Sequence, residues 1–296
     1  MNNSHCLICN SADNVKIFID YNALHAKRNI VKCKECNFVF FETDKNGKLD
    51  DSYWDNKQHI DVYENHEVQN GFEIESKKRI DAINELTSKG LLLDIGCGLG
   101  DFLRVARENG WKVCGVEISS LAAEYARRKY ALDVHQGTIE NCNFGSESID
   151  VVTMWDVIEH VQNPIQALSA IRNKLKKGGM LVIKTPDDQS LFKSLSRFMY
   201  FISLKKISFL LKYVYYIPHY YYYNKRSLSR MLEKFGFKVI NIQADETNYD
   251  FARNKIKLHY KKFFSKNIIL LVLPLAYFFS RILKLQNKMI VYAVKE

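Results

Sequence analysis

The spacing of hydrophobic positions along the chain changes at residue 91. Before it, apolar residues between Ile74 and Leu86 recur at the spacing of one helix face, and this pattern ends at Gly90. After it, short apolar runs alternate with amphipathic stretches. The runs predict strands at 91–95, 112–117, 132–135, 149–155 and 180–185, and the stretches predict helices at 101–109, 119–130 and 163–176. Strands that alternate with helices indicate a parallel sheet in a three-layer α/β fold.

From residue 187 this alternation breaks and then resumes. A helix at 225–236 and a strand at 237–243 follow a first insert, and a strand at 288–294 follows a second one. We therefore divide the chain into a cysteine module at 1–50, a helical linker at 51–90, an α/β core at 91–189, a helical insert or lid at 190–224, and the rest of the core at 225–296, with a basic, apolar helical insert at 248–285.

Composition identifies a folded protein and locates its charge. The 296 residues are 47% hydrophobic and 26% charged, which excludes a disordered or collagen-like chain. The net charge is +10, but residues 190–296 hold 20 Lys and Arg against 5 Asp and Glu, so residues 1–189 are mildly acidic. A polyanion or an anionic membrane surface is therefore the expected partner of the last third of the chain.

The N-terminus and the apolar runs predict the compartment. The opening sequence MNNSHCLICN has no charged segment followed by an apolar one, so we expect no secretory signal and a cytoplasmic protein. The longest uncharged apolar run, from Ile268 to Phe279, contains Pro274 and has 12 residues. A helix that crosses a bilayer needs about 20.

Two Cys-x2-Cys pairs lie 23 residues apart in the first module. Their members are Cys6, Cys9, Cys33 and Cys36. Four thiolates complete a tetrahedral site without water, which is typical of structural zinc, whereas a single pair of this kind also occurs as a redox motif. The remaining cysteines, Cys97, Cys114 and Cys142, are expected to be small buried apolar residues.

A glycine-rich turn follows the first core strand. Asp94 precedes Gly96, Gly98 and Gly100, which gives G-x-G-x-G rather than the G-x-G-x-x-G of dinucleotide-binding turns. A carboxylate at this position repels phosphate and suits a cationic ligand such as the ammonium group of an amino acid. Glu117 ends the next strand, where a carboxylate can accept hydrogen bonds from ribose hydroxyls.

Ordered motifs extend this pattern along the core. They are DIGCGLG, VEIS, GTIEN, MWDVIEHVQNP and LKKGGMLVIKTP. Over about residues 85–245 and the last strand, the chain resembles class I S-adenosylmethionine-dependent methyltransferases. The resemblance implies a Rossmann-like seven-stranded sheet with helices on both faces, and it implies that S-adenosylmethionine is bound. By this resemblance, Asp94, Gly96 and Gly98 hold the methionine portion, Glu117 the ribose, and Ile118, Thr138 and Ile139 the adenine, while Trp155 closes the pocket.

Acid–base residues follow the fourth core strand. Asp156, Glu159 and His160 are spaced to share one face if a helix begins there, and His219 ends the first insert. His219 or His160 is the candidate general base, with Asp156 beside it. The stretch also resembles ubiquinone-biosynthesis O-methyltransferases and small-RNA 2′-O-methyltransferases, in which a Glu-x-x-Glu-His arrangement and a later histidine hold a divalent metal. Three readings therefore stay open: a metal at Asp156, Glu159, His160 and His219, a plain base, or capping and packing residues.

The resemblance also bears on the acceptor. CKECNFVFFET and DDSYW resemble the N-terminal zinc-ribbon segment of bacterial sugar and polysaccharide methyltransferases. This implies O-methylation of a sugar hydroxyl, on a small-molecule or lipid-linked glycan. The alternatives are a quinone precursor or another lipid, and a non-enzymatic zinc-ribbon interaction protein with a vestigial fold. The Asn/Asp-Pro-Pro-Tyr motif of DNA-amino methyltransferases is replaced by Trp-Asp-Val-Ile, which disfavours that class.

Lysines punctuate both apolar inserts. They are Lys205, Lys206 and Lys212 in the first insert and Lys255, Lys257, Lys261, Lys262 and Lys266 in the second. Arg281 and Lys284 follow the apolar run of the second insert. Basic residues beside an apolar, aromatic helix are typical of a helix in a membrane interface, so the enzyme is expected to be peripheral to the inner face of a membrane. The alternative is an insert that packs on the sheet or on a partner protein. Nucleic acid is not favoured, because the aromatic residues lie among apolar ones.

Overall fold

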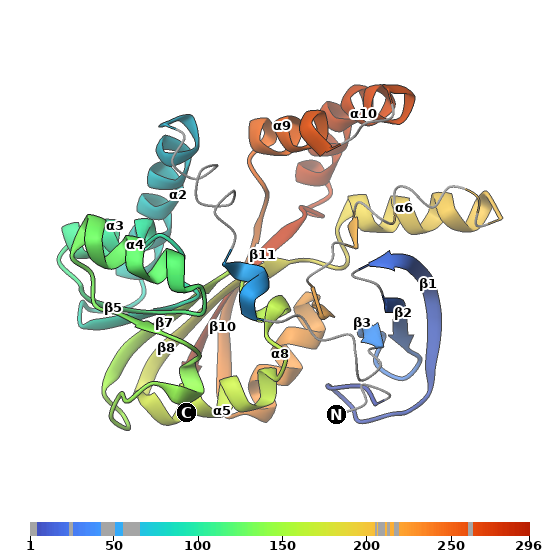
Figure 1. Cartoon of the computed structure of the whole chain (residues 1–296). Coiled ribbons are helices and arrows are strands. Elements are labelled where there is room, and N and C mark those ends of the chain that lie inside the picture. The colour runs from blue at the N-terminus through green and yellow to red at the C-terminus, as the bar shows by residue number, and fades with distance from the viewer. Residues whose placement is uncertain are drawn as a thin grey trace. The chain divides into compact units, whose positions relative to one another are not determined.

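A seven-stranded sheet in the order β10-β11-β8-β7-β4-β5-β6 dominates the computed structural model (Figure 1). The structure describes residues 5–23, 26–42, 51–55, 66–204, 206, 211, 214–215, 219–259 and 263–296. The strands of this sheet are β4 (Leu91–Ile95), β5 (Lys112–Glu117), β6 (Val134–Gln136), β7 (Ile149–Trp155), β8 (Leu175–Pro186), β10 (Phe237–Asp245) and β11 (Lys288–Lys295). The predicted α/β class and its seven-stranded sheet are confirmed.

The central strands are apolar on both faces, as strands between two layers must be. Leu92 and Leu93 of β4 are fully buried, and so is Val152 of β7. β4 pairs in parallel with β5 on one side and with β7 on the other. β5 then pairs in parallel with β6, and β7 with β8. In this register Asp94 lies beside Thr153, so the polar residues that end these strands gather at one edge of the sheet.

Helices follow the strands close to the expected positions. They are α2 (His66–Asn84), α3 (Asp101–Glu108), α4 (Ser120–Tyr130), α5 (Pro164–Lys174), α6 (Leu191–Ile202), α8 (Lys225–Lys234), α9 (Tyr249–His259) and α10 (Phe263–Ile282). The side chain of Ser119 caps α4, and that of Asn163 caps α5, whose first residue is Pro164. These caps fix where α4 and α5 begin.

The segment after β7 differs from a continuous helix. Asp156 has a left-handed backbone with φ of 58°, and a 3-10 turn at Ile158–His160 precedes α5. The left-handed residue interrupts the helical geometry that Asp156, Glu159 and His160 need to share one face. The cap at Asn163 and Pro164 instead starts the helix after this turn.

The chain divides into two compact units. Unit 1 comprises Met1–Lys48, Thr185–Arg230 and Ile242–Ile290, and unit 2 comprises Leu49–Lys184, Met231–Asn241 and Val291–Glu296. Strands β8, β10 and β11 run from one unit into the other. Unit 2 holds the sequence from β4 to β7, and unit 1 holds the cysteine pairs and both inserts.

A second, four-stranded sheet belongs to unit 1 (Figure 1). Its strands are β1 (Asn14–Ala23), β2 (Ala26–Cys33), β3 (Val39–Glu42) and β9 (Tyr221–Tyr222), in antiparallel pairs. Phe41 and Tyr222 meet in its buried core with their ring centroids 5.7 Å apart. The run of four tyrosines in the first insert thus completes the sheet of the cysteine module.

The stretches 43–50 and 56–65 lie outside the described residues, and so do Lys205, Lys212, Lys261 and Lys262. Among the helices that the structure does describe, no stretch is both long and apolar enough to cross a membrane.

Candidate cofactor site and metal centre

The glycine turn after β4 has the geometry of a ligand-binding loop. Gly96, Gly98 and Gly100 all have positive φ, at 68°, 54° and 86°. A Cβ atom on Gly96 would lie 2.5 Å from Cγ2 of Val157, and one on Gly100 would lie 2.6 Å from Cδ1 of Leu132. A Cβ atom on Gly98 would meet nothing within 4 Å. Gly96 and Gly100 therefore permit close packing, whereas Gly98 borders open space that a ligand can occupy.

Asp94 lies buried at the base of this turn. The hydroxyl of Thr153 donates to its Oδ1 at 2.6 Å. Burial and the nearby charge of Glu117 raise the pKa of Asp94, while the bond from Thr153 and the charge of Arg79 oppose the shift, and the pKa that results is about 7. A cationic ligand group beside this carboxyl group would favour its ionised form. The site is therefore suited to an ammonium, as the sequence suggests.

Glu117 reaches back from the end of β5 to the same turn. Its Oε2 accepts from the N–H of Gly98 at 2.7 Å, and its Oε1 accepts from the N–H of Ser119 at 2.9 Å. Burial raises the pKa of Glu117, and these backbone bonds oppose the shift. The carboxylate thus links the loop to the start of α4. It keeps acceptor capacity for the hydroxyls of a bound ribose.

A charged cluster that the sequence interpretation missed covers the ends of β7 and β8. Arg79 of α2 lies 4.5 Å from the ring centroid of Trp155, and its Nη2 is 2.6 Å from Oε1 of Glu75. The fully buried Nζ of Lys184 donates to the same oxygen. A lysine within the apolar run of β8 is the signal that could have indicated this cluster. The position of α2 over the strand ends had no local signal.

Trp155 is packed on more than one side. Its ring meets the ring of Phe102 in α3 edge-on, with the centroids 5.0 Å apart, in addition to the guanidinium of Arg79. Both partners come from helices that flank the glycine turn. The side chain therefore has a fixed position at the end of β7, and its predicted role in closing the pocket stays a prediction.

The residues assigned to adenine follow β5 and β6. Ile118 and Thr138 are half-buried, and Ile139 is 2% exposed. Asp55, which the sequence interpretation missed, binds the start of α4: it accepts from Oγ of Ser119 at 2.8 Å and from Oγ of Ser120 at 3.0 Å. The bond from Ser119 lowers the pKa of Asp55. This carboxylate holds the segment that carries Glu117 and Ile118.

The proposed acid–base residues lie in different units. In unit 2, Glu159 is 1% exposed, and the half-buried ring of His160 meets Trp54 edge-on at a centroid distance of 5.0 Å. In unit 1, the half-buried ring of His219 lies 5.9 Å from the ring of Tyr222. Their roles as a base or as metal ligands stay predictions, as does that of Asp156.

The four cysteines of the first module converge. Their Sγ atoms all lie within 4.8 Å of one another, with Cys6 and Cys36 at 3.3 Å and Cys9 and Cys33 at 3.5 Å. A tetrahedral zinc ion with Zn–S bonds of about 2.3 Å requires sulfur atoms ~3.8 Å apart. The donor set and its spacing therefore fit a structural zinc ion.

Two matching turns present these cysteines. Asn10 and Asn37 follow the second cysteine of each pair, and both have left-handed backbones, with φ of 62° and 60°. The N–H of each donates back to the carbonyl of the first cysteine of its pair, at 2.8 and 2.9 Å. Asparagine tolerates this conformation better than most residues. The repeated Cys-x2-Cys-Asn sequence thus forms two equivalent turns that face one another.

Comparisons with known proteins agree with this geometry. The chain is 36% identical over 101 residues to the mitochondrial ubiquinone biosynthesis O-methyltransferase of Schizosaccharomyces pombe, which covers 32% of this chain and 37% of that protein. It is 35% identical over 101 residues to the ubiquinone biosynthesis O-methyltransferase of Cereibacter sphaeroides, which covers 32% and 40%. The chain thus matches less than half the length of either relative.

Solved structures share the fold. A crystal structure of an S-adenosylmethionine-dependent methyltransferase from Archaeoglobus fulgidus aligns with a TM-score of 0.51 and 22% identity, over 75% of this chain and 94% of that one. The seven-stranded sheet is that of the class I methyltransferases. The sequence profile of the methyltransferase domain matches residues 65–242, which is more than half of the chain, and the protein belongs to this family.

Proposed function

We propose that the protein transfers a methyl group from S-adenosylmethionine to a sugar hydroxyl in the synthesis of a surface glycan or polysaccharide. The observation that carries the methyl-transfer part is the joint arrangement of Asp94, Gly98 and Glu117 around one loop in a chain of the methyltransferase family. The sugar acceptor is supported by the four-cysteine module and its CKECNFVFFET segment.

In this proposal each residue has a distinct task. Asp94 pairs with the ammonium group of S-adenosylmethionine, and Glu117 accepts hydrogen bonds from its ribose hydroxyls. The space beside Gly98 receives the part of the ligand that links these two groups. The acceptor oxygen attacks the methyl carbon as the carbon–sulfur bond breaks, and S-adenosylhomocysteine leaves. The hydroxyl proton passes to a base, for which His160 and His219 are the candidates. Positioning supplies most of the catalysis.

The cysteine module has a structural task in the same proposal. Cys6, Cys9, Cys33 and Cys36 would hold a zinc ion whose four positions are all filled by protein. Such an ion stabilises its fold and leaves no open position for chemistry. A divalent metal at Asp156, Glu159, His160 and His219 remains a separate proposal. It predicts that a chelator abolishes transfer under conditions that leave the cysteine site loaded.

A specific observation favours a second acceptor class. Both curated relatives described above are ubiquinone biosynthesis O-methyltransferases, which supports a quinone precursor or another lipid as the alternative. A non-enzymatic interaction protein is the third reading. The intact glycine turn and the placement of Glu117 argue against it.

Transfer of labelled methyl groups distinguishes these proposals. Purified protein is incubated with methyl-labelled S-adenosylmethionine and with separated soluble and membrane extracts, beside a Glu117→Ala variant as control. Label in sugar-containing material supports the main proposal, and label in quinone or other lipid extracts without sugar supports the alternative. If wild-type protein transfers no label and also fails to bind S-adenosylhomocysteine at micromolar concentration, the enzyme proposal is wrong.

A further inference from the structure

Helix α6 in unit 1 buries polar side chains and exposes large apolar ones. Lys193 and Ser196 are buried, with 5% of each exposed. Phe198 and Phe201 of the same helix are 58% and 78% exposed, and Leu204 directly after it is 81% exposed. A surface helix in a water-soluble domain normally shows the opposite distribution.

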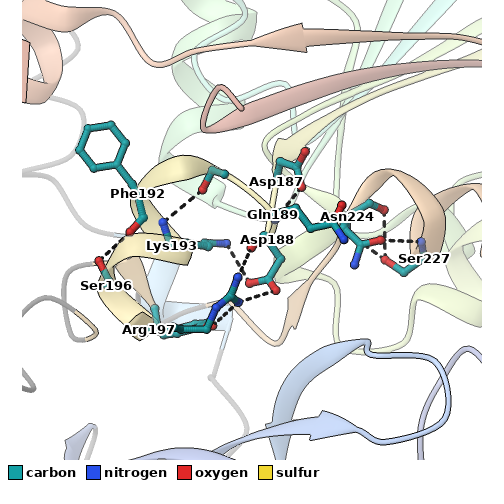
Figure 2. Close-up of polar contacts among 11 residues, drawn as sticks. Asp187, Asp188, Gln189, Phe192, Lys193, Ser196, Arg197, Asn224 and Ser227 are labelled. Carbon is teal, nitrogen blue, oxygen red and sulfur yellow. Dashed lines mark hydrogen bonds and ion pairs between the residues drawn. The ribbon is translucent and has the colours of Figure 1, made fainter. Parts of the chain in front are cut away.

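A polar cluster holds α6 in this orientation. Figure 2 shows Lys193 and Arg197 pointing toward Asp188, which follows β8. Nη1 of Arg197 is 2.8 Å from Oδ2 of Asp188, and Nζ of Lys193 is 3.7 Å from Oδ1. Arg197 also donates to the hydroxyl of Tyr215 at 2.9 Å, and Lys193 lies 4.8 Å from the ring centroid of Tyr222. Because these polar contacts are made on the inner side of α6, the apolar side of the helix is exposed to solvent.

Helix α10 in the same unit presents a second apolar face. Leu273 and Tyr277 pack inward, and the ring centroid of Tyr277 lies 5.9 Å from that of Phe192 in α6. The exposed large apolar residues of α10 recur at helical spacing. They are Leu271, Val272, Leu275, Phe278, Phe279 and Ile282, each at least 42% exposed. Among the described residues, these two helices and the residues directly after them hold twelve of the eighteen exposed large hydrophobic side chains.

Positive charge borders these faces. No charged residue lies between Lys266 and Arg281, but Lys266 precedes the apolar face of α10 and the exposed Lys284 follows it. Lys206 is exposed two residues after Leu204, beyond the end of α6. Apolar faces with basic rims are complementary to a surface that has an apolar interior and anionic head groups.

We propose that the outward faces of α6 and α10 insert into the interface of an anionic lipid membrane. The inner side of α10 is covered by protein, which suits a helix that lies in the interface. A second copy of the chain is a poorer occupant, because a two-fold contact would bring the same basic rims together. The proposal concerns where the protein binds, and its test does not depend on the methyl-transfer reaction.

Vesicle binding tests this directly. The full-length protein is centrifuged with vesicles of phosphatidylcholine alone or with about one third phosphatidylglycerol. We expect at least tenfold stronger partitioning onto the anionic vesicles, reduced by high salt. A Leu275→Glu/Phe278→Glu variant should lose about thirtyfold of this binding, since it removes two inserted side chains and adds two charges that anionic lipid repels. The matched control, Leu86→Glu/Ile165→Glu, changes two exposed apolar residues outside both helices and should bind as wild type.

The second helix is tested with Phe198→Glu/Phe201→Glu, for which we also expect at least a tenfold loss. Each variant must keep wild-type circular dichroism and thermal melting, so that a folding defect is distinguished from a lost surface. Equal vesicle binding by wild type and both variants overturns the proposal. So does a wild-type dimer in sedimentation that dissociates in these variants without any vesicle binding, because a second copy would then cover the faces.

Discussion

The buried carboxyl group of Asp94 makes a pH-dependent prediction about the cofactor site. Its ionised form pairs with the donor ammonium, but burial raises its pKa to about 7 in the ligand-free protein. Affinity for S-adenosylhomocysteine, which keeps the ammonium, should therefore fall about tenfold between pH 8 and pH 6. Isothermal titration calorimetry at several pH values measures this. An affinity that stays constant over this interval would refute the assigned pairing.

The same carboxyl group makes a linked prediction about stability. Its ordinary pKa is 3.8, so the raised pKa means that its neutral form is favoured in the folded state. The folded state therefore has its full stability with respect to this group below about pH 4, and it loses stability as the pH rises through about 7, because the buried group must then ionise. At pH 8 the free energy of unfolding is lower by about 4 kcal/mol than it would be if the pKa of Asp94 were the same in the folded and unfolded states. Asp94→Asn should thus raise the melting temperature at pH 8, with a smaller gain at pH 5, while it abolishes ligand binding. A destabilised Asp94→Asn protein would contradict this account.

Three further predictions concern the loop, the cysteine site and the anchor of α6. Gly98→Ala should weaken S-adenosylhomocysteine binding while it costs only about 1 kcal/mol of stability, because of the positive φ at this position. Gly96→Ala should destabilise the fold further, because the new Cβ atom would clash with Val157. Calorimetric titration measures the loss of binding, and thermal melts measure the loss of stability. Cys9→Ser should reduce zinc from one ion per chain to almost none, as metal analysis after gel filtration would show, and unchanged zinc content would exclude the four-cysteine site. Asp188→Asn should destabilise unit 1 by about 3 kcal/mol in urea unfolding followed by circular dichroism, because it removes the carboxylate that pairs with the half-buried Arg197 and the buried Lys193.

Local sequence patterns were sufficient to predict the sheet and the cofactor loop. Apolar runs gave β4 and β7, and the glycine spacing with Asp94 and Glu117 located the turn, because each signal lies within a few consecutive residues. The cysteine site could be predicted for the same reason. The repeated Cys-x2-Cys-Asn turns produce the geometry of each pair locally.

Features that depend on distant contacts could not be predicted in this way. Arg79 reaches Trp155 because α2 crosses the strand ends, and β9 joins β3 across about 180 residues of sequence. Asp156 has a left-handed backbone that no local sequence signal indicates, so no helix begins there. The sequence of α6 also did not indicate which of its sides is buried, because apolar and basic residues are interspersed along it. The contacts of Lys193 with Asp188 and Tyr222 show which side faces inward.

The proposed binding of S-adenosylmethionine by Asp94, Gly98 and Glu117 of unit 2 is tested most directly by calorimetric titration of wild type and Glu117→Ala with S-adenosylhomocysteine. We predict one site per chain with micromolar affinity for wild type. The variant should lose about 100-fold of this affinity, since Glu117 both accepts from ribose and holds the N–H of Gly98. Absence of binding to the wild-type protein, or equal binding by the variant, would contradict the account.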